Sequence, residues 1–181
     1  MKISILLPYK ENFSPEYAGA VSIFVNDTTI SSKFKNSITI FGNTKFKKKL
    51  QKNYINLPFK KEIFQSGSKV YINNFLSIEK KNNSDVIEIH NRPAYIKSIV
   101  DETKAKLVLY FHNDPLTMNG SKSVSERLFL INKVEKIIFN SEWTKKRFIN
   151  KLNKFYHKLE KLEVIPQSTN KVKVNIKNKK K

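Results

Sequence analysis

The chain has 181 residues, enough for one domain with a sizeable core or for two small ones. Hydrophobic residues make up 39% of the chain and aromatic residues 12%, which excludes a disordered protein. The absence of cysteine excludes disulfide scaffolds and cysteine-ligated zinc sites. No apolar run approaches the roughly 20 residues that span a bilayer, and the amino terminus lacks a full signal-peptide core, which argues against secretion.

The charge is strongly basic, with 35 Lys and Arg against 15 Asp and Glu, a formal net charge of +20. Such a balance attracts the phosphates of nucleic acid, anionic lipid or soluble nucleotides. Only Arg92, Arg127 and Arg147 are arginines, so the planar fork used in specific phosphate and base recognition is scarce. We interpret most of this charge as a solvated, lysine-rich surface.

Strand-sized and helix-sized apolar patterns alternate along the chain. A buried strand is predicted at 3–8 and is followed by a polar loop that ends at Ala18, Gly19 and Ala20. Residues 44–66 show no clear pattern beyond a short strand at 54–57. Further strands are predicted at 37–41, 85–90, 107–112, 136–140 and 162–165, and helices at 21–31, from 68 to about 82, from 93 to about 102, from 124 through 131, and from 141 to about 150.

This alternation predicts the α/β class: a Rossmann-like parallel sheet flanked by helices on both faces. Residues 1–168 form the expected domain, and 169–181 read as a basic linker or tail leading towards an absent carboxyl-terminal domain. Ligands of such sheets bind at the carboxyl ends of the strands. The residues to examine are therefore 8–20, 90–92, 112–114 and 140–141.

Two of the three histidines, His90 and His112, are the last residues of predicted strands. If those strands are parallel neighbours, both imidazoles would open onto one crevice. The alternative is that each is a hydrogen-bonded structural histidine. The third, His157, lies in a lysine-rich stretch and is interpreted as a surface residue.

Other motifs are weak or missing. The phosphate-binding patterns G-x-x-x-x-G-K-[ST] and G-x-G-x-x-G, the hydrolase pattern G-x-S-x-G and metal-binding histidine spacings do not occur. The segment 120–123 could hold an anion, but Ser123 and Glu126 have capping-box spacing, which makes a plain helix start the simpler interpretation. Aromatic residues between lysines give a faint resemblance to a base-stacking surface; they are Phe46, Tyr54 and Phe59.

Taken together, the motifs resemble the amino-terminal domain of family 4 glycosyltransferases. The resemblance extends from Ile3 to about Ser168 and is strongest over 85–150; individual pieces are unspecific, and their order and spacing carry it. The motifs are Asp85-Val-Ile-Glu-Ile-His90-Asn91-Arg92-Pro93, Leu109-Tyr110-Phe111-His112-Asn113-Asp114-Pro115 with Met118, Gly120-Ser121-Lys122, Glu126-Arg127, and Phe139-Asn140-Ser141-Glu142-Trp143.

The resemblance implies one half of a GT-B fold and a set of site residues. His112 matches the active-site histidine that lies against the donor sugar. Gly19 and Ala20 match the small residues where the backbone approaches donor phosphates and acceptor, although Ala20 departs from the commoner glycine. The acceptor side would be lined by His90, Asn91 and Arg92, and the expected binding set is completed by Asn113, Asp114, Ser121 and Lys122.

The implied function is that of a retaining glycosyltransferase, which moves a sugar from a nucleotide-sugar to a saccharide or lipid-linked acceptor in cell-surface polysaccharide or lipopolysaccharide synthesis. The donor-binding half is missing, so the chain is expected to be inactive alone and to need that domain in cis or in trans. No metal or other cofactor is implied. The expected place is the cytoplasm, with peripheral contact to anionic lipid at the inner face of the membrane. The alternatives are a non-catalytic basic module that binds phosphate or nucleic acid, without a specific nucleic-acid motif, and a scaffold for a separate donor domain.

Overall fold

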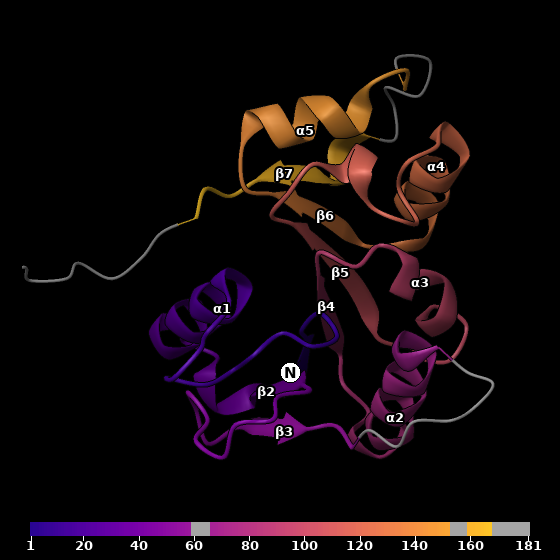
Figure 1. The fold of residues 1–181 in the computed structure, drawn as a ribbon. Coiled ribbons are helices and arrows are strands. Elements are labelled where there is room, and N and C mark those ends of the chain that lie inside the picture. The colour runs from indigo at the N-terminus through magenta and orange to yellow at the C-terminus, as the bar shows by residue number, and fades with distance from the viewer. Residues whose placement is uncertain (59–65, 153–158, 168–181) are drawn as a thin grey trace, which may run out of the picture.

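The computed structural model describes residues 1–58, 66–152 and 159–167. They form a seven-stranded sheet in the order β3-β2-β1-β4-β5-β6-β7, and every pairing is parallel (Figure 1). The chain builds outwards from β1 to β3, then returns to the other side of β1 with β4. The topological switch point therefore lies between β1 and β4, where ligands of open α/β sheets bind.

The strands are short and rich in β-branched and aromatic residues, which suits a sheet buried on both faces. Most begin and end within one or two residues of the predicted bounds. They are β1 Ile3–Leu6, β2 Ile38–Gly42, β3 Tyr54–Asn56, β4 Val86–His90, β5 Lys106–Phe111, β6 Lys136–Phe139 and β7 Leu162–Val164.

The helices follow the predicted order, and short 3₁₀ turns are added, among them Lys35–Ser37 and Pro115–Thr117. Asn83, in the left-handed region at φ 52°, ends α2 at the predicted end of this helix near residue 82. The α-helices are α1 Ala20–Ser31, α2 Gly67–Asn82, α3 Ala94–Ile99, α4 Val124–Lys133 and α5 Glu142–Ile149.

The two faces of the sheet have separate cores, because side chains alternate between faces along each strand. One core joins α1, through Phe24 and its neighbours, to strand residues such as Ile5 and Tyr110. The other joins α2, α3, α4 and α5 to strand residues such as Ile87 and Phe111. Figure 1 shows the same division, with α1 apart from the other four helices. The predicted Rossmann-like α/β class is confirmed, although a single described helix covers one face.

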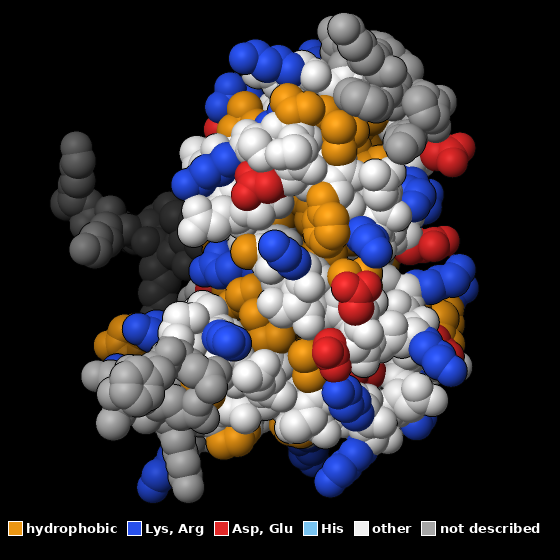
Figure 2. All heavy atoms as spheres, turned by 90° about the vertical axis from the view of Figure 1, so that its right-hand side faces the viewer, with side chains coloured by type: hydrophobic (Ala, Val, Ile, Leu, Met, Phe, Trp, Pro, Cys, Tyr) orange, Lys and Arg blue, Asp and Glu red, His pale blue; other side chains and the backbone are white. Residues whose placement is uncertain are grey.

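Charged side chains are dispersed over the visible surface. Figure 2 shows the face that carries α2 and α3, where lysines lie among acidic side chains instead of gathering into one patch. None of the helices within the described ranges is long and apolar enough to cross a membrane. The predicted tail at 169–181, Phe59 and His157 lie outside the described residues.

Candidate functional site

A pocket of about 280 Å³ opens at the carboxyl ends of the strands, over the switch point. Its walls come from the loops that follow β1, β4, β5 and β7 and from the first turn of α1. This is the edge at which the fold class places ligands. The lining residues are Pro8, Glu11, Ala20, Val21, Asn91, Arg92, His112, Asn113 and Gln167.

The backbone of His112 is held from both neighbouring strands. Its N–H donates to Asn91 Oδ1 at 2.8 Å, and its carbonyl accepts from Asn140 Nδ2, also at 2.8 Å. Asn91 reaches this position with φ 52°, a left-handed conformation that asparagine tolerates, and its own N–H donates to Tyr110 O. Asn91 and Asn140, which directly follow β4 and β6, therefore fix the position of the His112 backbone at the end of β5.

The two predicted histidines lie side by side, as expected for neighbouring parallel strands. His90 Nδ1 is 2.8 Å from His112 Nε2. Tyr110 stacks on the His112 ring with centroids 4.5 Å apart, and Phe24 of α1 meets that ring edge-on at 5.1 Å. Packing and one ring–ring hydrogen bond therefore hold His112 in a single orientation.

The two imidazoles differ in their access to the pocket. His112 is 9% exposed and lines the pocket, whereas His90 has no exposed surface and lies behind it. Glu88, two residues before His90 on the same face of β4, brings its Oε1 to 2.7 Å from His90 Nε2. The expectation that both rings open onto the crevice therefore holds for His112 only, and His90 can act on a ligand only through it.

Burial also sets the protonation of the site. Desolvation of the charged ring, with a further contribution from His90, lowers the pKa of His112 to about 3. Burial and the nearby Glu88 carboxylate raise the pKa of Tyr110 to about 12, and its hydroxyl donates to Ile165 O at 2.6 Å. At neutral pH the pocket therefore presents a neutral imidazole, which can hydrogen-bond a ligand without adding charge.

The amino terminus of α1 is occupied by the chain's own carboxylate. Glu11 Oε1 accepts from Ser22 N at 3.2 Å, where the helix dipole favours a negative group. The same carboxylate fills the space beside Gly19: a Cβ there would lie 1.9 Å from Glu11 Oε1. The small residue at 19 thus permits a close approach, and the group that approaches in this structure is Glu11.

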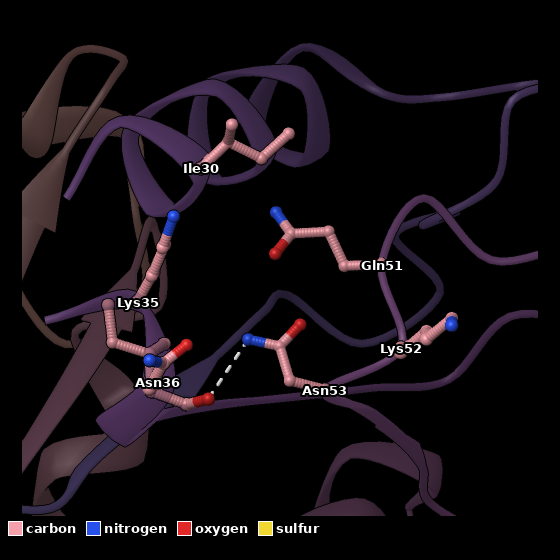
Figure 3. A pocket seen from close by; sticks show the side chains of 7 residues that line it. Ile30, Lys35, Asn36, Gln51, Lys52 and Asn53 are labelled. Carbon is pink, nitrogen blue, oxygen red and sulfur yellow. Dashed lines mark hydrogen bonds between the residues drawn. The ribbon is translucent and has the colours of Figure 1, made fainter.

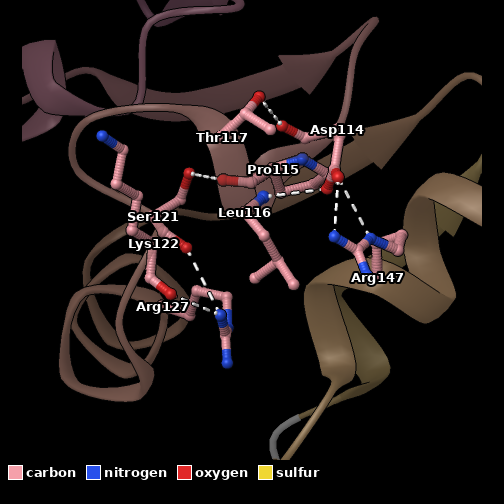
Figure 4. Close-up of polar contacts among 8 residues, drawn as sticks. All are labelled: Asp114, Pro115, Leu116, Thr117, Ser121, Lys122, Arg127 and Arg147. Atoms are coloured by element: carbon pink, nitrogen blue, oxygen red, sulfur yellow. Dashed lines mark hydrogen bonds and ion pairs between the residues drawn. The ribbon is translucent and has the colours of Figure 1, made fainter.

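Three further predicted residues have local structural partners (Figure 4). Asp114 Oδ2 accepts from Arg147 Nη2 at 2.8 Å, and this hydrogen bond lowers the pKa of the Asp114 carboxyl. Ser121 is fully buried and donates to Pro115 O at 2.6 Å. The carbonyl of Lys122 accepts from the buried Arg127 at 3.0 Å, while the residue itself is exposed. None of the three lines the pocket around His112.

The anion-binding interpretation of 120–123 is also weakened by the structure. Ser123 and Glu126 form the full capping box of α4, as the simpler interpretation predicted. Gly120 has φ 92° and lies against α3, where a Cβ would be 2.5 Å from Ala94 N. The segment is therefore built to start α4 and to pack on α3.

A hollow of about 500 Å³ lies at the opposite edge of the sheet, between the end of α1 and the segment before β3 (Figure 3). The Gln51 amide donates to Asn26 O, and the Asn53 amide donates to Ile38 O, so these polar groups serve the chain itself. It is larger than the His112 pocket. However, it lies at the amino ends of the strands, where this fold class does not place ligands.

The base-stacking surface suggested by the sequence is incomplete. Tyr54 is buried and stacks on Phe13 with centroids 4.9 Å apart, so no base could reach it. Phe46 is half-buried against Tyr17 at 5.3 Å. The described part of the chain also contains no cluster of three His, Asp or Glu side chains placed to hold a metal ion.

The structure thus gathers five predicted residues into one pocket: Ala20, Asn91, Arg92, His112 and Asn113. Sequence reasoning did not single out Glu11, Glu88 or Gln167, although Glu11 lies in the loop 8–20 that it marked for examination. Glu88 had a usable signal, because it shares a strand face with His90, and Gln167 follows β7 as closely as the predicted residues follow their strands. For Glu11 the only signal was the position of its loop after the first strand, because no motif marks the residue itself.

Comparison with known proteins shows the fold. No family model matches the chain, and no curated protein sequence matches it. Among solved structures, sucrose-phosphate synthase from Thermosynechococcus elongatus matches 94% of this chain and 49% of its own, with a TM-score of 0.61 and 10% identity. A UDP-N-acetylglucosamine 2-epimerase matches 82% of this chain and 44% of its own, with a TM-score of 0.49 and 9% identity.

The chain therefore spans about half the length of the first of these structures. The likeness supports a GT-B-like fold, of which this sheet corresponds to one half. It does not show family 4 in particular.

Proposed function

We propose that this chain is the acceptor-side half of a retaining glycosyltransferase and that the pocket around His112 is its sugar site. The observation that carries the proposal is the pocket itself: a neutral imidazole, amides and one charge of each sign, placed at the switch point. Sugar hydroxyls both donate and accept hydrogen bonds, so such a mixed lining suits them better than a uniformly basic one. The likeness to a sugar-transferring enzyme, whose chain is about twice as long, supports the same proposal.

Three of the lining residues have specific roles in this proposal. His112 contacts the donor sugar. Asn91 positions His112, because its Oδ1 accepts a hydrogen bond from the His112 backbone N–H at 2.8 Å. Arg92 is exposed at the rim, where its guanidinium can pair with an anionic acceptor or a phosphate. Contacts to the departing diphosphate come from a second lobe, in the same polypeptide or another, and no metal is required on this half.

The biosynthetic context and the cellular location complete the proposal. The reaction belongs to cell-surface polysaccharide or lipopolysaccharide synthesis, with a lipid-linked or soluble saccharide as the acceptor. The protein works in the cytoplasm, and the lysine-rich surface docks on anionic lipid at the inner face of the membrane. These assignments rest on the motif resemblance, and the pocket is compatible with them.

Amide NMR of the purified chain tests the sugar site. Titration with UDP-glucose and with GDP-mannose should shift resonances of the pocket, above all Asn91, His112 and Asn113. The His112→Gln variant should lose most of this response. Lys80→Gln is the matched control, because Lys80 is exposed near the opposite edge of the sheet and pairs with Glu102. Shifts confined to other surfaces would contradict the proposal.

Two further results would also contradict it. Robust sugar transfer by this chain alone would show that no second lobe is needed. Salt-sensitive binding of random DNA that survives His112→Ala and disappears when the lysines of 45–49 are removed would favour the nucleic-acid alternative.

A further inference from the structure

A continuous chain of polar atoms runs from the partly exposed Glu88 of β4, through the buried His90, to the pocket. Glu88 Oε1 lies 2.7 Å from His90 Nε2, and His90 Nδ1 lies 2.8 Å from His112 Nε2. The chain ends at His112 Nδ1, which contacts the amide nitrogen of Gln167 after β7. Both ring nitrogens of both histidines are thus in polar contact, and only the last one faces the pocket.

The Glu88 carboxylate, at the end of this chain away from the pocket, determines where the protons lie. A carboxylate oxygen only accepts hydrogen bonds. An unprotonated His90 Nε2 at 2.7 Å from it would therefore place two lone pairs against each other, which is repulsive. His90 Nε2 must therefore carry the proton. This nitrogen is fully buried and makes no hydrogen bond among the described residues, because the short Glu88 contact lies off the N–H direction. Glu88 Oε1, at 2.7 Å, is nonetheless the acceptor within reach of this N–H.

The remaining protons follow by elimination. A neutral His90 protonated at Nε2 presents a lone pair at Nδ1, so His112 Nε2 must donate across the 2.8 Å contact. His112 then keeps a lone pair at Nδ1, and the Gln167 amide donates to it. Tyr110 stacks on both rings, at 5.5 Å from His90 and 4.5 Å from His112, which opposes a ring flip that would exchange the nitrogens.

We propose that Glu88 and His90 are positioning residues that hold His112 in its Nε2–H tautomer, so that its Nδ1 accepts a hydrogen bond from a ligand hydroxyl. Gln167 holds the place of that hydroxyl in the unliganded protein. The identity of the ligand rests on the proposed function, whereas the tautomer does not. The inference assigns His112 the role of an acceptor for a sugar hydroxyl and not that of a donor to a phosphate oxygen.

Long-range ¹H–¹⁵N spectra of the unliganded protein at pH 7.5 test the tautomer directly. The chain has three histidines, so loss of one spin system in His112→Gln assigns its signals. In the wild type, Nε2 of His112 should appear protonated and Nδ1 unprotonated. The opposite pattern would overturn the proposal without any reference to a ligand.

Two substitutions at Glu88 test its control over the tautomer. Glu88→Lys replaces an obligatory acceptor with an obligatory donor, which should reverse the chain and move the His112 proton to Nδ1. Glu88→Met removes the acceptor and should give a mixture of tautomers. Glu163→Lys makes the same charge change on β7, outside the chain, and should leave the His112 pattern unchanged. Unaltered His112 signals in both Glu88 variants, with native amide spectra, would refute the positioning role.

UDP-glucose binding distinguishes a failure of this inference from a failure of the proposed function. UDP-glucose affinity should fall about tenfold in Glu88→Lys, the loss expected for one hydrogen bond, and should be retained in Glu163→Lys. If UDP-glucose fails to bind the wild type while the tautomer results hold, the proposed function fails and the positioning role stands. If UDP-glucose binds both Glu88 variants as tightly as the wild type, the acceptor role of Nδ1 is wrong.

Discussion

The pH dependence of stability tests whether His112 is buried in its neutral form. Its pKa in the folded protein is about 3, because burial and His90 disfavour the charged ring, against about 6.5 in an unfolded chain. Between these values the unfolded chain binds a proton that the folded chain does not. The stability contribution of the neutral ring is therefore complete above pH 6.5 and is lost as the pH falls towards 3.

The size of the effect follows from the width of this window. Each pH unit well inside it costs about 1.4 kcal/mol, and the unfolded histidine is already half protonated at pH 6.5. A fall from pH 6.5 to pH 4.5 therefore costs about 2.3 kcal/mol through this one side chain. The figure is an upper limit, because His112 keeps 9% exposure at the open edge of the pocket, where water can stabilise the charged ring. It is still a large fraction of the roughly 5–15 kcal/mol that stabilises an ordinary domain.

Urea unfolding at the two pH values measures the loss, with His112→Gln as the reference that cannot titrate. Comparing the two proteins cancels the carboxylates that they share. Between pH 6.5 and pH 4.5, the variant should gain up to about 2.3 kcal/mol relative to the wild type. Asn113→Gln, at an exposed neighbour that also cannot titrate, should track the wild type at both values. A wild-type–variant difference that is constant within about 0.5 kcal/mol would show that folded His112 titrates near its ordinary pKa.

Substitutions at three other positions test the structure around the site. Asn91→Ala leaves the buried His112 N–H unpaired and places alanine at φ 52°, which should cost about 2–4 kcal/mol in urea unfolding; Asn91→Gly relieves only the backbone part and should recover about 1 kcal/mol of it. Gly120→Ala puts alanine at φ 92° and places its Cβ 2.5 Å from a backbone nitrogen of α3. Thermal unfolding should show a loss of at least about 2 kcal/mol, and an unchanged Tm would contradict this packing. Asp114→Asn removes the partly exposed ion pair with Arg147 and should cost at most about 1 kcal/mol at pH 7. Because the pKa of Asp114 is lowered, the difference from wild type should begin to shrink below about pH 4 and vanish only below that lowered pKa; a difference that persists at still lower pH would assign the loss to packing.

Much of the fold was predictable because its signals are local. Apolar runs of strand length, the capping box at Ser123 and the break at Asn83 depend on neighbours in the sequence, and they place the elements within a residue or two. Their alternation leaves few topologies, since parallel strands need right-handed crossovers. The adjacency of His90 and His112 follows from the same rule, because β4 and β5 are consecutive parallel strands with matching ends.

What each polar side chain does at the strand ends was decided by tertiary packing. Asp114 and Ser121 carry functional residue types, yet Arg147 and the Pro115 carbonyl engage them. Periodicity could not reveal either contact, because each depends on how a loop folds back on itself or on α5.

The sequence by itself determined that two imidazoles end neighbouring strands of a parallel sheet. Only the tertiary structure decided that His90 is sealed behind α1 while His112 reaches the pocket, because that depends on where Phe24 and Tyr110 pack. It likewise brought Gln167 to His112 across 55 positions of the chain. Strand order follows from local sequence patterns. The solvent access and protonation of a side chain depend instead on all the residues that pack around it in the folded protein.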